Sequence, residues 1–215
     1  AIADNQPVTT IRGLAHRQDG RIVVNPPRPA ITDLDQLPFP ARDGTADRHY
    51  SYPDSLRHPV FPIITSRGCP GQCTFCTAHL LHGRRFRFRS AANVIAEIAE
   101  LVTRHGAREI HIWDDNFVTN RRRVREIRDG LCAADIHVAF AFPNGIRADC
   151  VDPEILQTLK EMGTYSVAIG VESGVSACST GCVKGPARTR SAPPSVRPGN
   201  SASRPGGSFS SACLA

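Results

Sequence analysis

Residues 60–76 read VFPIITSRGCPGQCTFC and join a short apolar run to three closely spaced cysteines. The run from Val60 to Thr65 is rich in β-branched residues, which predicts a buried strand. The loop after it contains glycine and proline and has the spacing Cys-x3-Cys-x2-Cys, at Cys69, Cys73 and Cys76. The sequence therefore places three thiols directly after the first strand of a regular region.

Helical and strand patterns alternate after this loop. Apolar residues at helical spacing predict helices that begin after the capping residues Ser90 and Asp152, and a further helix around Val124 to Leu131. Apolar runs predict three more strands, at 109–113, 137–142 and 166–171. This alternation predicts an α/β fold with parallel strands, in which functional sites lie at the carboxyl ends of the strands.

The two flanks lack this alternation. Residues 1–59 are predicted to form an irregular, proline-rich lead-in with one short strand at Arg21 to Val24. Residues 175–215 are rich in Ser, Pro, Gly, Ala and Arg and contain no acidic residue, which predicts a disordered tail. This tail supplies most of the net charge of +6, so the charge argues against a nucleic-acid partner.

Composition also bears on the cellular compartment. No apolar run is long enough to span a bilayer, and the N-terminus lacks a signal-peptide pattern, so we expect a cytoplasmic protein. Because the chain begins with Ala1 rather than Met, we expect a fragment or a processed product.

Three thiolates in a tight loop predict an iron–sulfur cluster. Each thiolate can bind one iron of a [4Fe–4S] cluster, and the fourth iron then stays open to a small molecule. A zinc site is the main alternative, with His79 or His82 as the fourth ligand. Three unrelated structural cysteines are a second alternative. The spacing of the cysteines and their position after a strand favour the cluster.

The motif from Arg67 to Cys76, with the aromatic Phe75 directly before the last cysteine, resembles the signature of radical S-adenosylmethionine (SAM) enzymes. The resemblance implies a [4Fe–4S] cluster whose open iron binds the amino and carboxylate groups of SAM. In this family the reduced cluster cleaves SAM to methionine and a 5′-deoxyadenosyl radical, which abstracts hydrogen from a substrate. The family fold is a partial (β/α)6 TIM-like barrel, and residues 60–174 would supply about four βα units.

The same resemblance implies a set of cofactor-binding residues, most of them at strand ends. These are Phe75, Asp114, Asp115, Asn116, Arg147, Glu172 and Ser173. Other interpretations stay open for several of them. Asp114 and Asp115 could cap a helix or lie in a solvated loop, Glu172 could be an ordinary acid at a strand end, and Arg147 could pair with Asp149 or Glu154.

The lead-in resembles the connector of the cobalamin-binding branch of this family. The segments that carry the resemblance are Gly13–Arg17, Asp19–Val23, Asp33–Pro40 and Gly83–Ser90. In that branch a cobalamin-binding domain precedes the connector, and it is absent from this sequence. The branch includes methyltransferases and ring-forming cyclases, which implies a small-molecule substrate and an external electron donor of the flavodoxin or ferredoxin type. The arginines of residues 83–90 could contact an anionic substrate, nucleic acid or only water.

The resemblance runs from about Thr10 to Gly174 and then stops. The predicted domains are therefore a connector at 1–59, a partial barrel at 60–174 and a tail at 175–215 that comes from a shifted reading frame. Four of six expected strands would leave the last strand with an unpaired edge. Cys132 and Cys150 are expected to be buried or half-buried. The alternatives to a cobalamin-associated radical SAM enzyme are a tRNA-modifying radical SAM enzyme, a zinc-binding module and a non-functional truncated product.

Overall fold

The computed structural model describes residues 6–44, 51–170 and 210–213 of the 215-residue chain. The chain divides into two compact units, Ala1–Thr32 and Asp33–Ala215. The division falls inside the stretch predicted as a connector.

The first unit contains an antiparallel hairpin of β1 (Ala15–Gln18) and β2 (Arg21–Val24). Asp19 and Gly20 form its turn with positive φ angles of 48° and 78°, the conformation that a two-residue hairpin turn requires. Strand β2 was predicted, but its partner β1 was not. Strand β1 has the largely polar sequence Ala-His-Arg-Gln, so no alternation of apolar residues indicated a strand there.

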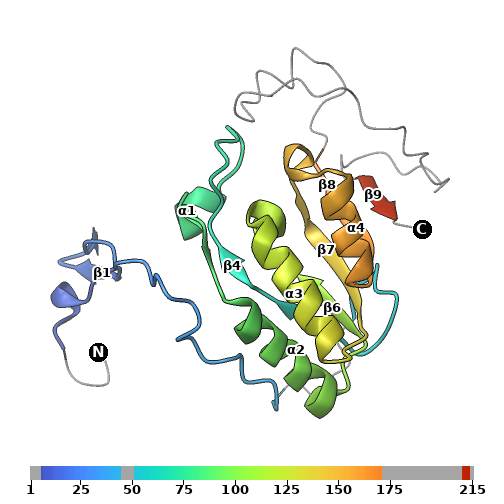
Figure 1. Cartoon of the computed structure of the whole chain (residues 1–215). Coiled ribbons are helices and arrows are strands. Elements are labelled where there is room, and N and C mark those ends of the chain that lie inside the picture. The colour runs from blue at the N-terminus through green and yellow to red at the C-terminus, as the bar shows by residue number, and fades with distance from the viewer. Residues whose placement is uncertain (1–5, 45–50, 171–209, 214–215) are drawn as a thin grey trace. The chain divides into compact units, whose positions relative to one another are not determined.

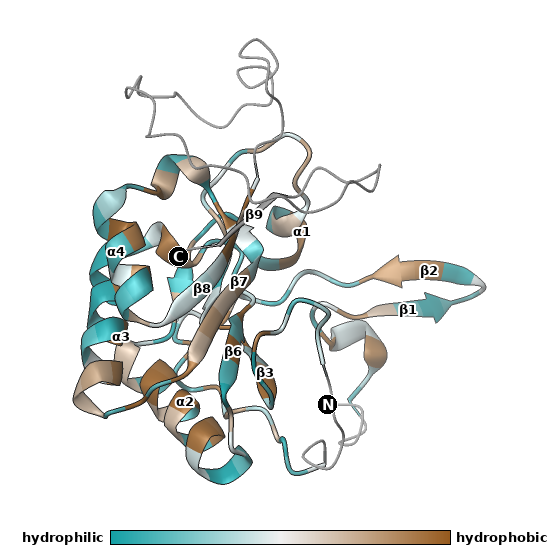
Figure 2. Cartoon of the chain, turned by 90° about the vertical axis from the view of Figure 1, so that its right-hand side faces the viewer, coloured by the Kyte–Doolittle hydropathy of each residue, from teal (hydrophilic) through white to brown (hydrophobic). Residues whose placement is uncertain are grey.

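The second unit is built on a sheet with the strand order β3-β6-β7-β8-β9. Strands β3 (Val60–Ile63), β6 (Glu109–Ile112), β7 (Ala139–Ile146) and β8 (Thr164–Ile169) are parallel. Helices α2 (Ala91–His105), α3 (Arg121–Ala133) and α4 (Pro153–Glu161) connect them and lie together over one face of the sheet (Figures 1 and 2). The predicted α/β fold with parallel strands is confirmed.

Each of these helices begins at a side chain that caps it. Ser90 Oγ accepts a hydrogen bond from the Asn93 N–H, and Asp152 Oδ1 accepts one from the Ile155 N–H. Helix α3 is capped in the same way by Asn120. Such caps satisfy backbone donors that have no partner within the helix.

The hydrophobic core lies between the helices and the sheet. Strand residues with side chains on this face, such as Ile110, Phe140 and Val167, are buried against the helices. Because side chains alternate along a strand, the intervening residues face the opposite side of the sheet. The register places His111, Ala141 and Ser166 side by side in one row there.

Strand β9 (Ser210–Cys213) pairs antiparallel with β8 and corrects two predictions about the tail. Its backbone covers the edge of β8, so the predicted unpaired edge was wrong. The prediction of a tail without structure was wrong for these four residues. The rest of the tail lies outside the described residues. Within the described part of the chain, no helix is long and apolar enough to cross a membrane.

Candidate metal centre

The three cysteines of the motif occupy a loop that follows β3. Strand β4 (Ser66–Arg67) pairs antiparallel with β5 (Arg87–Phe88), so this two-stranded pair closes the base of the loop. A short helix, α1 (Ala78–His82), follows the last cysteine. The loop therefore starts at the carboxyl end of a parallel strand, where the sequence predicted the site.

Gly68 sets the path of the chain into this loop. Its φ is +86°, and an added Cβ would lie 2.4 Å from the carbonyl oxygen of Arg85. Its N–H donates a hydrogen bond to Asp115 Oδ2 at 3.1 Å. Only glycine accepts this φ and this close approach without strain, so the residue fixes how the loop leaves β4.

The three thiols are half-buried and free of disulfides. Burial raises the pKa of the Cys69 thiol, while the Gly71 N–H and the nearby guanidinium of Arg147 act in the opposite direction. Within the described residues, no three Cys, His, Asp or Glu side chains converge closely enough to hold a metal ion. The three thiols nevertheless fit an iron–sulfur cluster in their chemistry and sequence spacing.

Arg147 directly follows β7, and its side chain reaches the cysteine loop. Its Nη1 donates a hydrogen bond to Cys73 Sγ at 3.2 Å. Its Nε and Nη2 bind the two carboxylate oxygens of Asp149 at 2.9 and 2.5 Å. Of the two pairings that the sequence left open, Asp149 is therefore the partner, and Glu154 pairs with Arg125 instead.

Asp114 lies beneath the loop with its carboxylate engaged. It is 2% exposed and accepts hydrogen bonds from the Thr65 N–H, the Thr65 hydroxyl and the Ser66 hydroxyl. Burial raises its pKa, although these hydrogen bonds oppose the shift. Asp114 is neither a helix cap nor a solvated loop residue, and its contacts give it a structural role. A cofactor-binding role for Asp114 stays a prediction.

The other predicted cofactor-binding residues differ in their surroundings. Asn116 is buried, donates from Nδ2 to Cys150 Sγ at 3.6 Å, and has no partner for its Oδ1 among the described residues. Phe75 is 53% exposed on the cysteine loop. Glu172 and Ser173 lie outside the described residues. Cys150 is half-buried as expected, whereas Cys132 is exposed, because it lies on a part of α3 that does not face the core.

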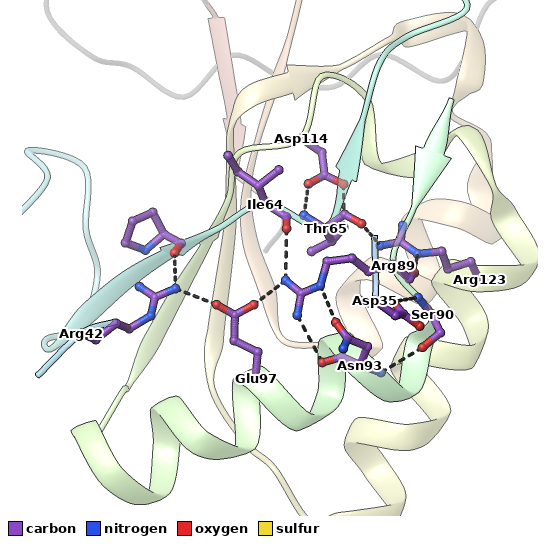
Figure 3. Close-up of polar contacts among 11 residues, drawn as sticks. Asp35, Arg42, Ile64, Thr65, Arg89, Ser90, Asn93, Glu97, Asp114 and Arg123 are labelled. Carbon is purple, nitrogen blue, oxygen red and sulfur yellow. Dashed lines mark hydrogen bonds and ion pairs between the residues drawn. The ribbon is translucent and has the colours of Figure 1, made fainter. Parts of the chain in front are cut away.

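A buried network of charges beside β3 was not predicted. Glu97 of α2 forms ion pairs with Arg42, at 2.7 Å, and with Arg89 (Figure 3). Arg89 and Arg87 are both buried, so contact with water alone, one of the three possibilities for the arginines of residues 83–90, is wrong for these two residues. One signal was present in the sequence, because Glu97 lies between Val94 and Leu101 on the apolar side of its helix.

Arg123 links this network to the strand that precedes the loop. Its Nε donates to the Arg89 carbonyl at 2.8 Å, and its Nη2 donates to the Thr65 carbonyl at 2.9 Å. Burial lowers its pKa to about 10. The buried arginine therefore ties α3 to the residues that precede the cysteine loop.

A cavity of about 570 Å³ opens next to this network. Its walls come from the 34–42 segment, from β3 and from the residues after β3 and β6, and they include Phe39, Tyr52, Arg67 and Trp113. This volume lies in the range of small-molecule sites. The lining combines aromatic and aliphatic side chains with a few charged groups.

Comparisons with known proteins agree with this geometry. The family model described as "Radical SAM superfamily" matches residues 63–189. The uncharacterized methyltransferase PH0819 of Pyrococcus horikoshii is 30% identical over 173 residues, which are 80% of this chain and 37% of that protein. The cytidylyl-2-hydroxyethylphosphonate methyltransferase of Streptomyces wedmorensis is 29% identical over 203 residues, covering 82% of this chain and 38% of that protein.

A solved structure shares the fold. The cobalamin-dependent SAM radical enzyme OxsB, determined with aqua-cobalamin and SAM bound, superposes with a TM-score of 0.67 at 21% identity. The match covers 86% of this chain and 27% of OxsB. The chain thus spans less than two fifths of each curated relative and about a quarter of this structure. The family model covers more than half of the chain and confirms the predicted family, so this chain belongs to the radical SAM superfamily.

Proposed function

We propose that Cys69, Cys73 and Cys76 hold a [4Fe–4S] cluster and that the cluster binds SAM at its open iron. When bound, such a cluster supplies one electron for the cleavage of SAM to methionine and a 5′-deoxyadenosyl radical. The position of the cysteine loop carries this proposal. The loop follows β3, its entry is fixed by Gly68 and Asp115, and a guanidinium from the end of β7 contacts one of its sulfurs.

We propose methyl transfer as the reaction of the whole protein. Both curated relatives described above are named methyltransferases, and OxsB, which shares the fold, is a cobalamin-dependent enzyme. A cobalamin-binding domain upstream of Ala1 would supply the second cofactor. Ring formation, the other reaction class of this branch, is distinguished from methyl transfer by the product.

The cavity beside β3 supports a small-molecule substrate. Its volume of about 570 Å³ suits a compact organic molecule, and Trp113 and Arg67 bring an aromatic and a cationic side chain to its wall. A flavodoxin or ferredoxin would deliver the electron in the cytoplasm. The tRNA-modifying alternative loses support, because Arg87 and Arg89 are buried and leave only Arg84 and Arg85 of that arm exposed to RNA.

Metal content tests the proposed site. The 215-residue chain is reconstituted anaerobically with iron and sulfide, and bound iron, sulfide and zinc are measured for the wild type and for single Cys→Ser variants at residues 69, 73 and 76. We expect about four irons and four sulfides per wild-type chain and a loss of bound iron in each variant. Cys132→Ser is the matched control, because this cysteine is exposed on α3 and far in sequence from the motif. Bound zinc without sulfide would overturn the proposal in favour of the zinc module.

A further inference from the structure

We infer that Arg147 is a positioning residue that raises the reduction potential of a cluster held by the cysteine loop. The inference rests on the proposed function and goes beyond it, because it assigns control of the cluster's reduction potential to one side chain. Arg147 follows β7, and Cys73 lies 74 residues earlier in the chain. The fold brings them to a distance of 3.2 Å between Nη1 and Sγ.

The geometry of Arg147 is held by its second partner. Asp149 binds Nε and Nη2 side by side, so the planar guanidinium has one orientation and points Nη1 at the sulfur. The Arg147 side chain is 17% exposed, whereas that of Asp149 is 51% exposed. The Arg147 cation is therefore the more buried member of the pair.

The loop is built to admit this guanidinium. A Cβ on Gly71 would lie 2.6 Å from Arg147 Nη1, closer than real contacts allow. The absence of a side chain at residue 71 thus leaves the guanidinium room to lie where it does, and a Cβ there would force Nη1 to shift. On the other side of the same residue, the Gly71 carbonyl accepts a hydrogen bond from Arg84 Nη1 at 2.7 Å. Arg84 therefore contacts a backbone carbonyl of the loop, whereas Arg147 contacts one of its sulfurs.

The physical consequence concerns the charge of the cluster. Reduction adds one negative charge that is shared with the ligating sulfurs. An N–H donor and a positive charge beside one sulfur stabilise the reduced state more than the oxidised state, which raises the potential. Asp149 offsets part of this charge but keeps the donor in place. Losing the guanidinium should therefore make the cluster harder to reduce.

The test is a redox titration followed by electron paramagnetic resonance on the reconstituted 215-residue chain. Arg147→Met removes charge and donor, and we expect its midpoint potential to shift to a more negative value. Arg147→Lys retains the charge without the planar donor pair, so its midpoint potential should lie between those of the wild type and Arg147→Met. Gly71→Ala keeps every charge but displaces the guanidinium, so it should shift in the same direction as Arg147→Met. Arg104→Met is the matched control and should stay close to the wild type, because Arg104 is exposed on α2 and pairs with Glu100.

The outcomes separate this inference from the proposed function. A wild type that takes up no cluster would refute the proposed function and the inference with it. A wild type with a cluster, and unchanged potentials in Arg147→Met and Gly71→Ala, would refute only the role of Arg147. If Arg147→Met does not take up a cluster, Gly71→Ala and Arg147→Lys decide, and wild-type potentials in both would contradict the inference.

Discussion

Asp114 and Thr65 are joined by two hydrogen bonds, one from the Thr65 N–H and one from its hydroxyl, each 2.6 Å long. Ser66 adds a third hydrogen bond to the same carboxylate at 2.5 Å. Thr65 and Ser66 are the residues through which β3 passes into β4. The end of β6 thus fixes the exit of β3, and with it the start of the cysteine loop.

We therefore expect Asp114→Asn to destabilise the fold. An amide offers one acceptor oxygen to three donors, so at least one buried donor loses its partner, at a cost of about 1–3 kcal/mol. The free energy of unfolding from urea titrations at neutral pH measures this loss. Asp129→Asn is a control, because this aspartate is exposed and pairs with Arg128 on the surface of α3.

The stability that depends on Asp114 should change with pH. Its folded pKa lies above the ordinary value of 3.8. At pH values between these two pKa values the folded protein keeps a proton that the unfolded chain has lost, so the stability of the wild type falls as the pH rises. Below pH 3.8 this contribution is complete. The difference in unfolding free energy between the wild type and Asp114→Asn, measured from about pH 3.5 upward, should therefore fall as the pH rises. A difference that rises with pH would contradict the raised pKa.

Glu97→Gln should lower the free energy of unfolding more than any surface change on the same helix. The Glu97 side chain is 3% exposed and compensates the half-buried Arg42 and the buried Arg89. Removing one partner from a buried ion pair leaves an uncompensated charge and typically costs about 3–5 kcal/mol. Glu100→Gln is the matched control, because Glu100 lies on the exposed side of α2 and pairs with Arg104. Its expected effect is below about 0.5 kcal/mol.

Gly68→Ala should disturb the cysteine loop more than the rest of the fold. The new Cβ would meet the Arg85 carbonyl at 2.4 Å, and the φ of +86° is unfavourable for alanine. The loop must then move away from the β4–β5 pair, which we expect to reduce the iron bound after reconstitution. Gly44→Ala is the control, since it meets nothing within 4 Å. Equal iron content in both variants would show that the loop does not need this entry geometry.

Patterns of apolar residues predicted most of the second unit. Ser90 and Asp152 predicted helix starts that the structure confirms, because a capping side chain is a local signal. The strand at 137–142 was predicted in the right place but too short, since β7 continues through Pro143 and Gly145 to Ile146. Proline and glycine break the strand pattern in sequence, although neighbouring strands can still hold such residues in a sheet.

Long-range polar contacts could not be predicted in the same way. The pairing of Arg147 with Asp149 was one of two possibilities, but its contact with Cys73 joins residues 74 positions apart. The burial of Arg87, Arg89 and Arg123 depends equally on the tertiary structure. Arginines normally remain in water, so a sequence pattern favours exposure until a partner such as Glu97 is known.

The most direct test of the central claim is the electron paramagnetic resonance spectrum of the reduced, reconstituted protein, recorded with and without SAM. If the three cysteines leave one iron open, we predict a [4Fe–4S]+ signal whose shape changes when SAM is added. A signal that SAM does not alter would contradict binding of SAM at an open iron in this chain.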